Sequence, residues 1–256
     1  MGILRHLFAV LASLITAGSA MAAQEGEWVS YRDAYRAMVM FEKYGKAKHL
    51  IQNQFQVMAR DKTVAPGGLQ LRLQGKTTSL NLPLDATGRT VFPLLKVAYD
   101  ENAALVLNRK VSDYLFRPRV SIVVRSDGVY ENADLRAACE QALAYQNSVD
   151  ASLLRARRCV GVRFVFAHGM ADPGVRLRRG EGSALPAADG PAFQGDPFEG
   201  FRVVNYRFAE GGDKVQVVTE TAPLAIHPVY EEAGTRGRQQ RQAPSAGAAQ
   251  AAGENR

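Results

Sequence analysis

Three residues of the kinds that form a hydrolytic triad lie within a stretch of sixteen residues. They are His168, Asp172 and Ser183. In such a triad the histidine accepts the proton of the serine hydroxyl and the carboxylate orients the histidine, an arrangement defined in space rather than by nearness in sequence. The chain lacks the G-x-S-x-G turn that presents a serine nucleophile in α/β-hydrolases. The catalytic residues therefore stay unknown, and a chance grouping of common residues is the simpler interpretation.

Two carboxylates, Asp196 and Glu199, are close enough in sequence to suggest a general acid and base. They lie in a segment rich in proline and glycine, where acidic side chains are usually solvated. We therefore interpret them as surface carboxylates of a loop. The spacing alone predicts no reaction.

Metal and cofactor sites are not predicted. Metal sites need clustered ligands, whereas the histidines after the N-terminal segment stand apart from one another: His49, His168 and His227. The sequence Asp100-Glu101-Asn102 lacks the alternating ligands of a calcium loop. No glycine-rich phosphate loop follows a predicted strand.

The positive charge of the chain lies largely outside its central part. Removing Arg5 and the four arginines and one glutamate after residue 232 lowers the net charge from +7 to +3. A nucleic-acid surface would need a basic stripe interleaved with aromatic residues, so we expect no nucleic-acid partner. The cluster Arg176, Arg178 and Arg179 could contact anionic lipids or acidic envelope polymers, although solvated loop charge is the alternative.

The N-terminal segment has the three parts of a cleavable export signal. A basic start ends at Arg5, residues 7–17 are almost wholly apolar, and Ala20-Met21-Ala22 supplies the small residues of a cleavage site. The apolar run is too short to span a membrane, which takes about 20 residues. We predict a signal peptide over 1–22 with cleavage near Ala22, a periplasmic or secreted protein, and no transmembrane segment in the mature chain.

Export makes a disulfide between Cys139 and Cys159 the favoured state of the two cysteines. It would close a loop of about 20 residues and contribute roughly 3 kcal/mol. Two free thiols or a redox pair are the alternatives, and a redox pair usually has the spacing Cys-x-x-Cys.

Hydrophobic periodicity indicates a helix first and then a series of strands. A helix over about 28–45 has apolar residues at spacings of three and four, with Ser30 as a potential N-cap. From Ile51 the period changes to two, with glutamines 52, 54 and 56 opposite the apolar face. Further alternating segments follow at 69–73, 80–84, 90–92, 104–107 and 120–124, with a turn at 85–89. This pattern predicts a β-sandwich over 49–125.

The second half of the chain is expected to return to helix and then to strand. A helical insertion is predicted over about 131–157, including a short second helix through Leu153 and Leu154. Closing strands are expected within 160–230, with a hairpin turn at 210–213. The segment 172–200 reads as one long loop, and 233–256 as a disordered tail.

The segment 69–124 resembles a known kind of module. The run LQLRLQGKTTSLNLPLDATGR, followed by NAALVLN and RPRVS, is similar to the carboxypeptidase-regulatory-like, or prealbumin-like, sandwich modules and to a group of uncharacterised exported bacterial proteins. The resemblance covers about a fifth of the chain and rests on turn chemistry. It implies a β-sandwich and no particular reaction.

The sequence thus predicts an α+β protein dominated by an antiparallel β-sandwich, with one globular region over 23–232. The favoured function is an exported, non-catalytic binding or structural protein of the cell envelope, whose partner is an envelope protein or polymer. The alternatives are a secreted hydrolase built around distant residues such as His168, and an accessory subunit of an envelope complex. The ligand and the oligomeric state are left open.

Overall fold

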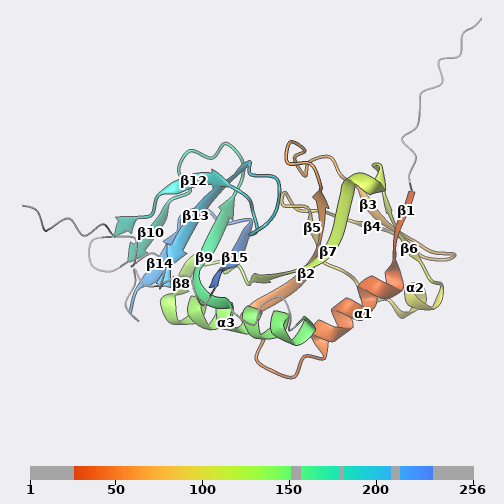
Figure 1. Cartoon of the computed structure of the whole chain (residues 1–256), viewed down its shortest axis with the longest axis horizontal. Coiled ribbons are helices and arrows are strands. Elements are labelled where there is room, and N and C mark those ends of the chain that lie inside the picture. Colours follow the sequence, from red (N-terminus) through yellow and green to blue (C-terminus); the bar gives the residue numbers. More distant parts are fainter. Residues whose placement is uncertain (1–25, 151–156, 179–181, 209–213, 233–256) are drawn as a thin grey trace, which may run out of the picture.

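The chain folds into antiparallel sheets with few helices, which confirms the predicted α+β class dominated by a β-sandwich (Figure 1). The computed structural model describes residues 26–150, 157–178, 182–208 and 214–232. The predicted signal segment, the short helix through Leu153 and Leu154, the turn at 210–213 and the C-terminal tail lie outside these residues. No helix of the described part is long and apolar enough to cross a membrane.

A seven-stranded sheet runs through the whole molecule. Its strands, in spatial order, are β12 (Ala187–Gly190), β13 (Phe201–Arg207), β9 (Arg157–Phe166), β15 (Ala225–Glu232), β7 (Tyr114–Ile122), β2 (Ile51–Ala59) and β5 (Arg89–Thr90).

Two four-stranded sheets accompany it, one in each half of the molecule. The first has the order β1 (Gly26–Ser30), β6 (Ala104–Leu107), β3 (Leu71–Gln74) and β4 (Ser79–Leu82). The second has the order β11 (Ser183–Ala184), β10 (Val175–Arg178), β14 (Gln216–Thr219) and β8 (Val129–Glu131).

The two halves of the large sheet meet at a single backbone pair. β15 pairs with β7 only at Ile226 and Ile122, whereas β7 pairs with β2 along its whole length. Beyond that pair each strand carries a proline, Pro118 in β7 and Pro228 in β15. Proline cannot donate a ladder hydrogen bond and is confined to strands with an open side. The two strands therefore part beyond their one shared pair.

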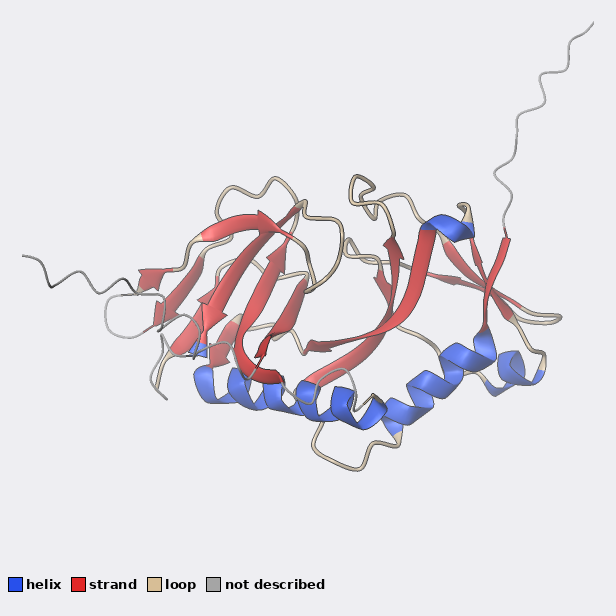
Figure 2. Ribbon diagram, viewed as in Figure 1, coloured by secondary structure: helices blue, strands red, loops and turns tan. Residues whose placement is uncertain are grey.

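The helices lie along one side of the sheets, with α1 and α3 almost end to end (Figure 2). They are α1 (Tyr31–Glu42), α2 (Lys96–Asp100) and α3 (Asn132–Val149), with a 3-10 turn, η1 (Val111–Asp113), before β7. The face of α1 that is buried repeats at the expected helical spacing: Tyr31, Ala34, Met38 and Phe41.

The predicted ends of the first helix were partly wrong. Ser30 occupies the N-cap position, but its side chain makes no capping hydrogen bond. The helix ends at Glu42 rather than Gly45, because Lys48 folds back and donates to the carbonyl oxygens of Phe41 and Glu42 at 2.6 and 2.5 Å. These contacts satisfy carbonyls that a helix end leaves without partners.

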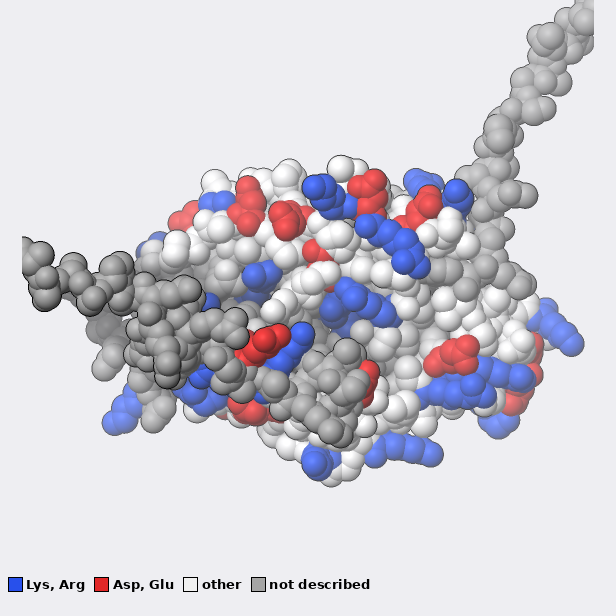
Figure 3. All heavy atoms as spheres, in the orientation of Figure 1, with Lys and Arg blue, Asp and Glu red and all other residues white. Residues whose placement is uncertain are grey.

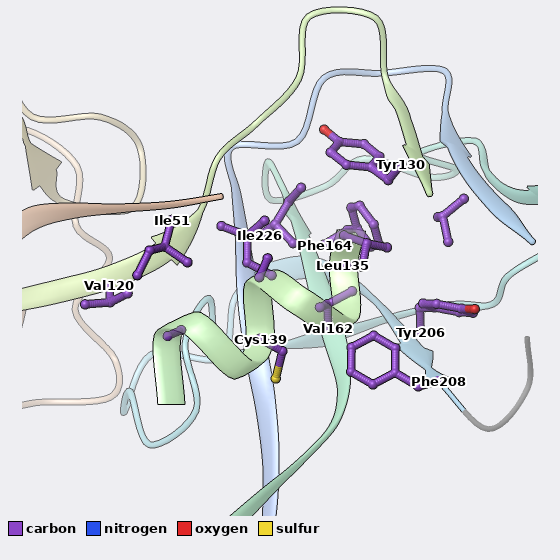
Figure 4. Close-up of a cluster of buried hydrophobic side chains, with 14 of the residues drawn as sticks. Ile51, Val120, Tyr130, Leu135, Cys139, Val162, Phe164, Tyr206, Phe208 and Ile226 are labelled. Carbon is purple, nitrogen blue, oxygen red and sulfur yellow. The ribbon is translucent and has the colours of Figure 1, made fainter. Parts of the chain in front are cut away.

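Two hydrophobic cores cover the same face of the large sheet. In one half, Phe55 and Val57 of β2 pack with α1 and with leucines of β3 and β6. In the other half, Val162 and Phe164 of β9 pack with α3 and with Tyr130 of β8 (Figure 4). Strand register explains the shared face, because alternate residues of paired strands point the same way.

Cys139 and Cys159 are joined at bonding distance, as the sequence predicts. Cys139 is fully buried on α3, and Cys159 lies near the start of β9. The bridge therefore fastens α3 to the large sheet at the edge of its core.

The expectation of one long loop over 172–200 was wrong, because strands β10, β11 and β12 lie within it. Val175 and Leu177 alternate with arginines and pair in register with β14. This period of two is short, and the surrounding prolines and glycines obscure it. The longest described stretch of this segment without a helix or strand is residues 191–200.

Several predicted strands have other limits in the structure, and two of them show why. The strand expected over 120–124 begins earlier, at Tyr114. Pro118 does not interrupt it, because β7 has no backbone partner among the described residues on one of its sides at that position. The strand expected over 90–92 is Arg89–Thr90. The turn before it has the predicted chemistry: the Asp85 carboxylate accepts the backbone N–H of Thr87 at 2.8 Å, and Gly88 has φ +78°.

Candidate functional site

The face of the large sheet opposite its two cores carries a group of arginines, where the halves meet. We call Arg89, Arg117, Arg119 and Arg163 the arginine centre. Arg117 and Arg119 alternate along β7, and Arg117 lies opposite Gln56 of β2. Figure 3 shows basic side chains gathered near the middle of one face of the molecule, over the region where β15 and β7 are neighbours.

The loop 191–200 places one carboxylate on this centre. Asp196 Oδ1 accepts hydrogen bonds from Nη2 of Arg117, at 2.7 Å, and from Nη2 of Arg119. Its Oδ2 accepts from Nε2 of Gln56 at 3.0 Å. The Asp196 side chain is only 5% exposed. The interpretation of Asp196 as a solvated loop acid was therefore wrong, while Glu199 is exposed as expected.

The buried state of Gln56 corrects a second expectation. The glutamines of β2 were predicted to lie on the solvent side of a half-buried strand, but Gln56 is 2% exposed. Its Oε1 accepts from Nε of Arg119 at 2.8 Å, and its Nε2 also donates to the carbonyl of Thr87. The loop 191–200 covers this face, so polar residues there are buried and paired with one another.

Arg89 is held by the turn that precedes β5. Its Nε donates to Asp85 Oδ2 at 3.0 Å and to Thr87 Oγ1 at 2.9 Å. Its Nη1 donates to Ser121 Oγ at 3.1 Å, and its Nη2 to the carbonyl of Leu224 at 2.6 Å. Arg89 thereby links the β5–β2–β7 half of the sheet to the chain that enters β15.

A phenylalanine from the loop 191–200 fills the middle of the centre. The Phe193 ring lies 4.6 Å from the guanidinium carbon of Arg119 and 5.4 Å from that of Arg89. It meets the ring of His227 edge-on, with centroids 5.2 Å apart. Phe193 is fully buried, so the cation–π contacts act where solvent does not weaken them.

His227 lies beside the arginines in a buried position. It is 5% exposed, and its Nδ1 has no hydrogen-bond partner among the described residues. Burial, followed by repulsion from Arg119, Arg163, Arg117 and Arg89, lowers the pKa of His227 well below its ordinary value. The ring is therefore neutral at neutral pH and can accept or donate a further hydrogen bond.

The same crowding affects the arginines. Burial, and repulsion from Arg117 and Arg89, lower the pKa of Arg119 to about 10, against the attraction of Asp196. Burial also lowers the pKa of Arg163, whose partners are neutral: Asn205 Oδ1 and the carbonyl of Pro191, each at 2.9 Å. Positive charge thus exceeds negative charge, since in the described structure the carboxylates that contact the four guanidinium groups are those of Asp85 and Asp196.

A cavity of about 390 Å³ adjoins the centre. Residues 117–120 of β7 contribute to its lining, together with residues of α1 and α3 that include Met40, Tyr145 and Val149. The charged residues Asp150 and Arg157 also line it. Met40 and Val149 are about half exposed. The combination of apolar walls and a few charged groups is typical of a small-molecule site.

His168 and Asp172 of the candidate triad are engaged with other partners, and Ser183 is exposed on a strand. His168 is exposed, and its Nδ1 lies 2.6 Å from the carbonyl oxygen of Gly200. Asp172 Oδ1 accepts the backbone N–H of Gly174 at 2.8 Å. Ser183 lies in β11 at an exposed position. None of these contacts joins the three side chains to one another.

The other residues considered for chemistry also have structural partners. Arg176 pairs with Glu220 at 2.8 Å on the exposed side of β10, and Arg178 donates to Gln216; Arg179 lies outside the described residues. Glu101 accepts from Thr77 and Thr78. Within the described residues no group of three potential metal ligands comes together.

Sequence reasoning missed the arginine centre, although one local signal was present. Arg117 and Arg119 alternate in a stretch that otherwise reads as a strand, which places both on one face. Arg89, Arg163 and Asp196 join them from distant parts of the chain, and no periodicity connects these positions.

A comparison of the chain with protein-family models, curated proteins and solved structures gives no match. The fold and the site define an α+β sandwich protein with a buried, arginine-rich centre at the junction of its two halves.

Proposed function

We propose that this chain is an exported, non-catalytic binding protein of the cell envelope whose arginine centre binds an acidic ligand. The observation that carries the proposal is the excess of positive charge: four guanidinium groups, all on buried or partly buried arginines, are matched by two carboxylates. Export is supported by the signal-like N-terminal sequence and by the bond between Cys139 and Cys159.

The physical reason to expect an acidic ligand is the free-energy cost of burying positive charge without a partner. A buried ion is stable only when it is paired and hydrogen-bonded. Arg163 has neutral partners alone, and Nδ1 of His227 has none among the described residues. The surplus of positive charge attracts an anion to the centre, whichever of the guanidinium groups the anion contacts. Arginine suits this role, because its planar guanidinium matches the geometry of a carboxylate.

The adjoining cavity supports a ligand that also has an apolar part. Its volume of about 390 Å³ and its lining by Met40, Tyr145 and Val149 suit an aliphatic or aromatic body. Arg117 and Arg119 would then contact the acidic group. The ligand class is therefore an amphipathic acid.

Calorimetric titration of the purified protein with octanoate, and with the neutral octanamide, tests this proposal. Octanoate is expected to bind and octanamide to bind much more weakly. The double variant Arg117→Gln/Arg119→Gln should bind octanoate at least about tenfold more weakly, since hydrogen bonds to charged groups are lost. The matched control is Arg36→Gln/Arg109→Gln, which removes the same charge from exposed positions. Equal loss in both double variants would contradict the proposal.

A further inference from the structure

The carboxylate of Asp196 occupies a position in which a ligand would be bound. We infer that Asp196 is an internal substitute for the ligand: a carboxylate-bearing ligand takes its place on Arg117, Arg119 and Gln56, and Asp196 moves out into solvent. This inference rests on the proposed function and specifies how the arginine centre is occupied and by which chemical group.

The contacts of Asp196 are those of a bound carboxylate. Both guanidinium groups donate to Oδ1 and the amide of Gln56 donates to Oδ2, so both oxygens are engaged. Asp196 comes from a loop, whereas Arg117, Arg119 and Gln56 lie on paired strands. The donors are therefore fixed by the sheet, and the acceptor is on the more movable element.

The space beside Asp196 does not admit a second carboxylate. The cavity that adjoins it, lined by Gln56, Thr87, Phe198 and neighbouring residues, measures about 20 Å³, which is room for about one water molecule. A ligand carboxylate that reaches Gln56 from this side must take the place of Asp196.

The loop can release Asp196 without releasing Phe193. Gln194, Gly195 and Glu199 are exposed, and Gly195 has φ +84° with open space around it. Phe193 is fully buried against Val165 and Val203 of the sheet. A rearrangement confined to 194–198 therefore frees the carboxylate while the rest of the loop stays packed.

The exchange conserves charge. One carboxylate leaves two guanidinium groups and another arrives, so the number of buried charges and of charge-assisted hydrogen bonds is unchanged. Without a replacement, the two arginines would be left unpaired in a buried site, which is strongly unfavourable. Because the exchange conserves charge, a ligand with a carboxylate is favoured over one with a phosphate. A phosphate carries more charge and a tetrahedral set of oxygens.

Octanoate titration of the Asp196→Asn variant tests the inference, with Glu199→Gln as its matched control. Both variants remove one negative charge from the same loop, but only Asp196 contacts the arginines. Asp196→Asn should bind octanoate about tenfold more tightly than the wild type, because the internal competitor is gone. Glu199→Gln should match the wild type, and octyl phosphate should bind Asp196→Asn more weakly than octanoate does.

The other outcomes separate the inference from the proposed function. Equal octanoate affinity in the wild type and Asp196→Asn, lost in Arg117→Gln, would overturn the inference and leave the binding site in place. Tighter binding of octyl phosphate would overturn the choice of carboxylate. Absence of octanoate binding to both folded proteins would contradict both. If Asp196→Asn is unstable, the rise of its Tm with octanoate should exceed that of the wild type, and an equal or smaller rise would count against the inference.

Discussion

The neutral, buried state of His227 has a direct consequence for stability. Its pKa in the folded protein lies well below the ordinary value of 6.5, because of burial and four nearby arginines. Below about pH 6.5 the unfolded chain binds a proton at this position that the folded protein does not. The free energy of unfolding is therefore expected to fall by about 1.4 kcal/mol for each pH unit in that range, until the folded-state pKa is reached.

Denaturant unfolding at pH 7.5 and pH 5.5, for the wild type and for His227→Gln, measures this effect. The difference between the two proteins isolates His227, since the other titrating groups contribute equally to both. The wild type should lose more stability on acidification than the variant does. An equal loss of stability in the wild type and the variant would show that His227 is accessible to protons in the folded state.

At the residue scale, a disulfide can be predicted from the sequence, because it depends on the presence of cysteines and on an oxidising compartment. The pairing of Cys139 with Cys159 could be predicted from the number of cysteines and from the predicted export signal. The environment of Asp196 could not, because an aspartate between glycine and proline resembles any solvated loop acid. Its burial depends on Arg117 and Arg119, nearly 80 positions earlier in the chain.

At the element scale, close strand packing makes Gly161 a position that does not tolerate a side chain. Gly161 lies in β9 between β13 and β15. A Cβ added there would collide with the backbone carbonyl of Tyr206, which cannot move without disturbing the ladder. Gly161→Ala is expected to destabilise the protein by about 1–3 kcal/mol, as overpacking does.

Gly45→Ala is the matched control for this substitution. A Cβ at Gly45 meets nothing within 4 Å, so its effect on stability should stay within about 0.5 kcal/mol, as is usual for surface positions. The midpoints of urea denaturation compare the two variants. A Gly161→Ala protein as stable as Gly45→Ala would show that β9 and β13 are not as closely packed as described.

The disulfide between Cys139 of α3 and Cys159 of β9 is a second feature at the scale of elements. It closes a loop with a sequence separation of 20, and its reduction should lower the free energy of unfolding by about 3 kcal/mol in the chain-entropy model. Denaturation with and without reductant measures the loss, and a Cys139→Ala/Cys159→Ala variant should not respond to reductant. Two alkylatable thiols in the unfolded, unreduced protein would contradict the bond.

The elements predicted best are strands in which apolar and polar residues alternate without interruption, and turns with specific chemistry. The strand Ile51–Ala59, the leucine strands β3 and β6, and the turn at Asp85 and Gly88 follow from local pattern. The strands β10 to β12 could not be recognised, because the prolines and glycines around them obscure the alternation of apolar and polar residues. Their existence depends on pairing with β13 and β14.

At the scale of the whole molecule, the two halves of the large sheet are joined mainly by side chains. One backbone pair, Ile226 with Ile122, connects β15 to β7. Arg89 reaches the carbonyl of Leu224 across this junction, and Asp196 reaches Arg117 and Arg119. The arginine centre thus has two roles: it connects the halves, and it supplies the positive charge on which the proposed function depends.

This junction explains why the site could not be predicted from the sequence. The centre exists only because β5, β7, β9 and β15 come together in one sheet, and that order follows no local pattern. A β-sandwich confined to residues 49–125, which the sequence predicts, would have placed Arg117 and Arg163 in separate surroundings.

The central claim is that the arginine centre binds a carboxylate, and titration of arginine Nε–Hε resonances by NMR tests it most directly. Octanoate should shift the resonances of Arg117 and Arg119 in a saturable way and leave that of exposed Arg109 unchanged, whereas octanamide should shift none of them. Resonances of Arg117 and Arg119 that stay fixed, or that follow Arg109, would contradict the account.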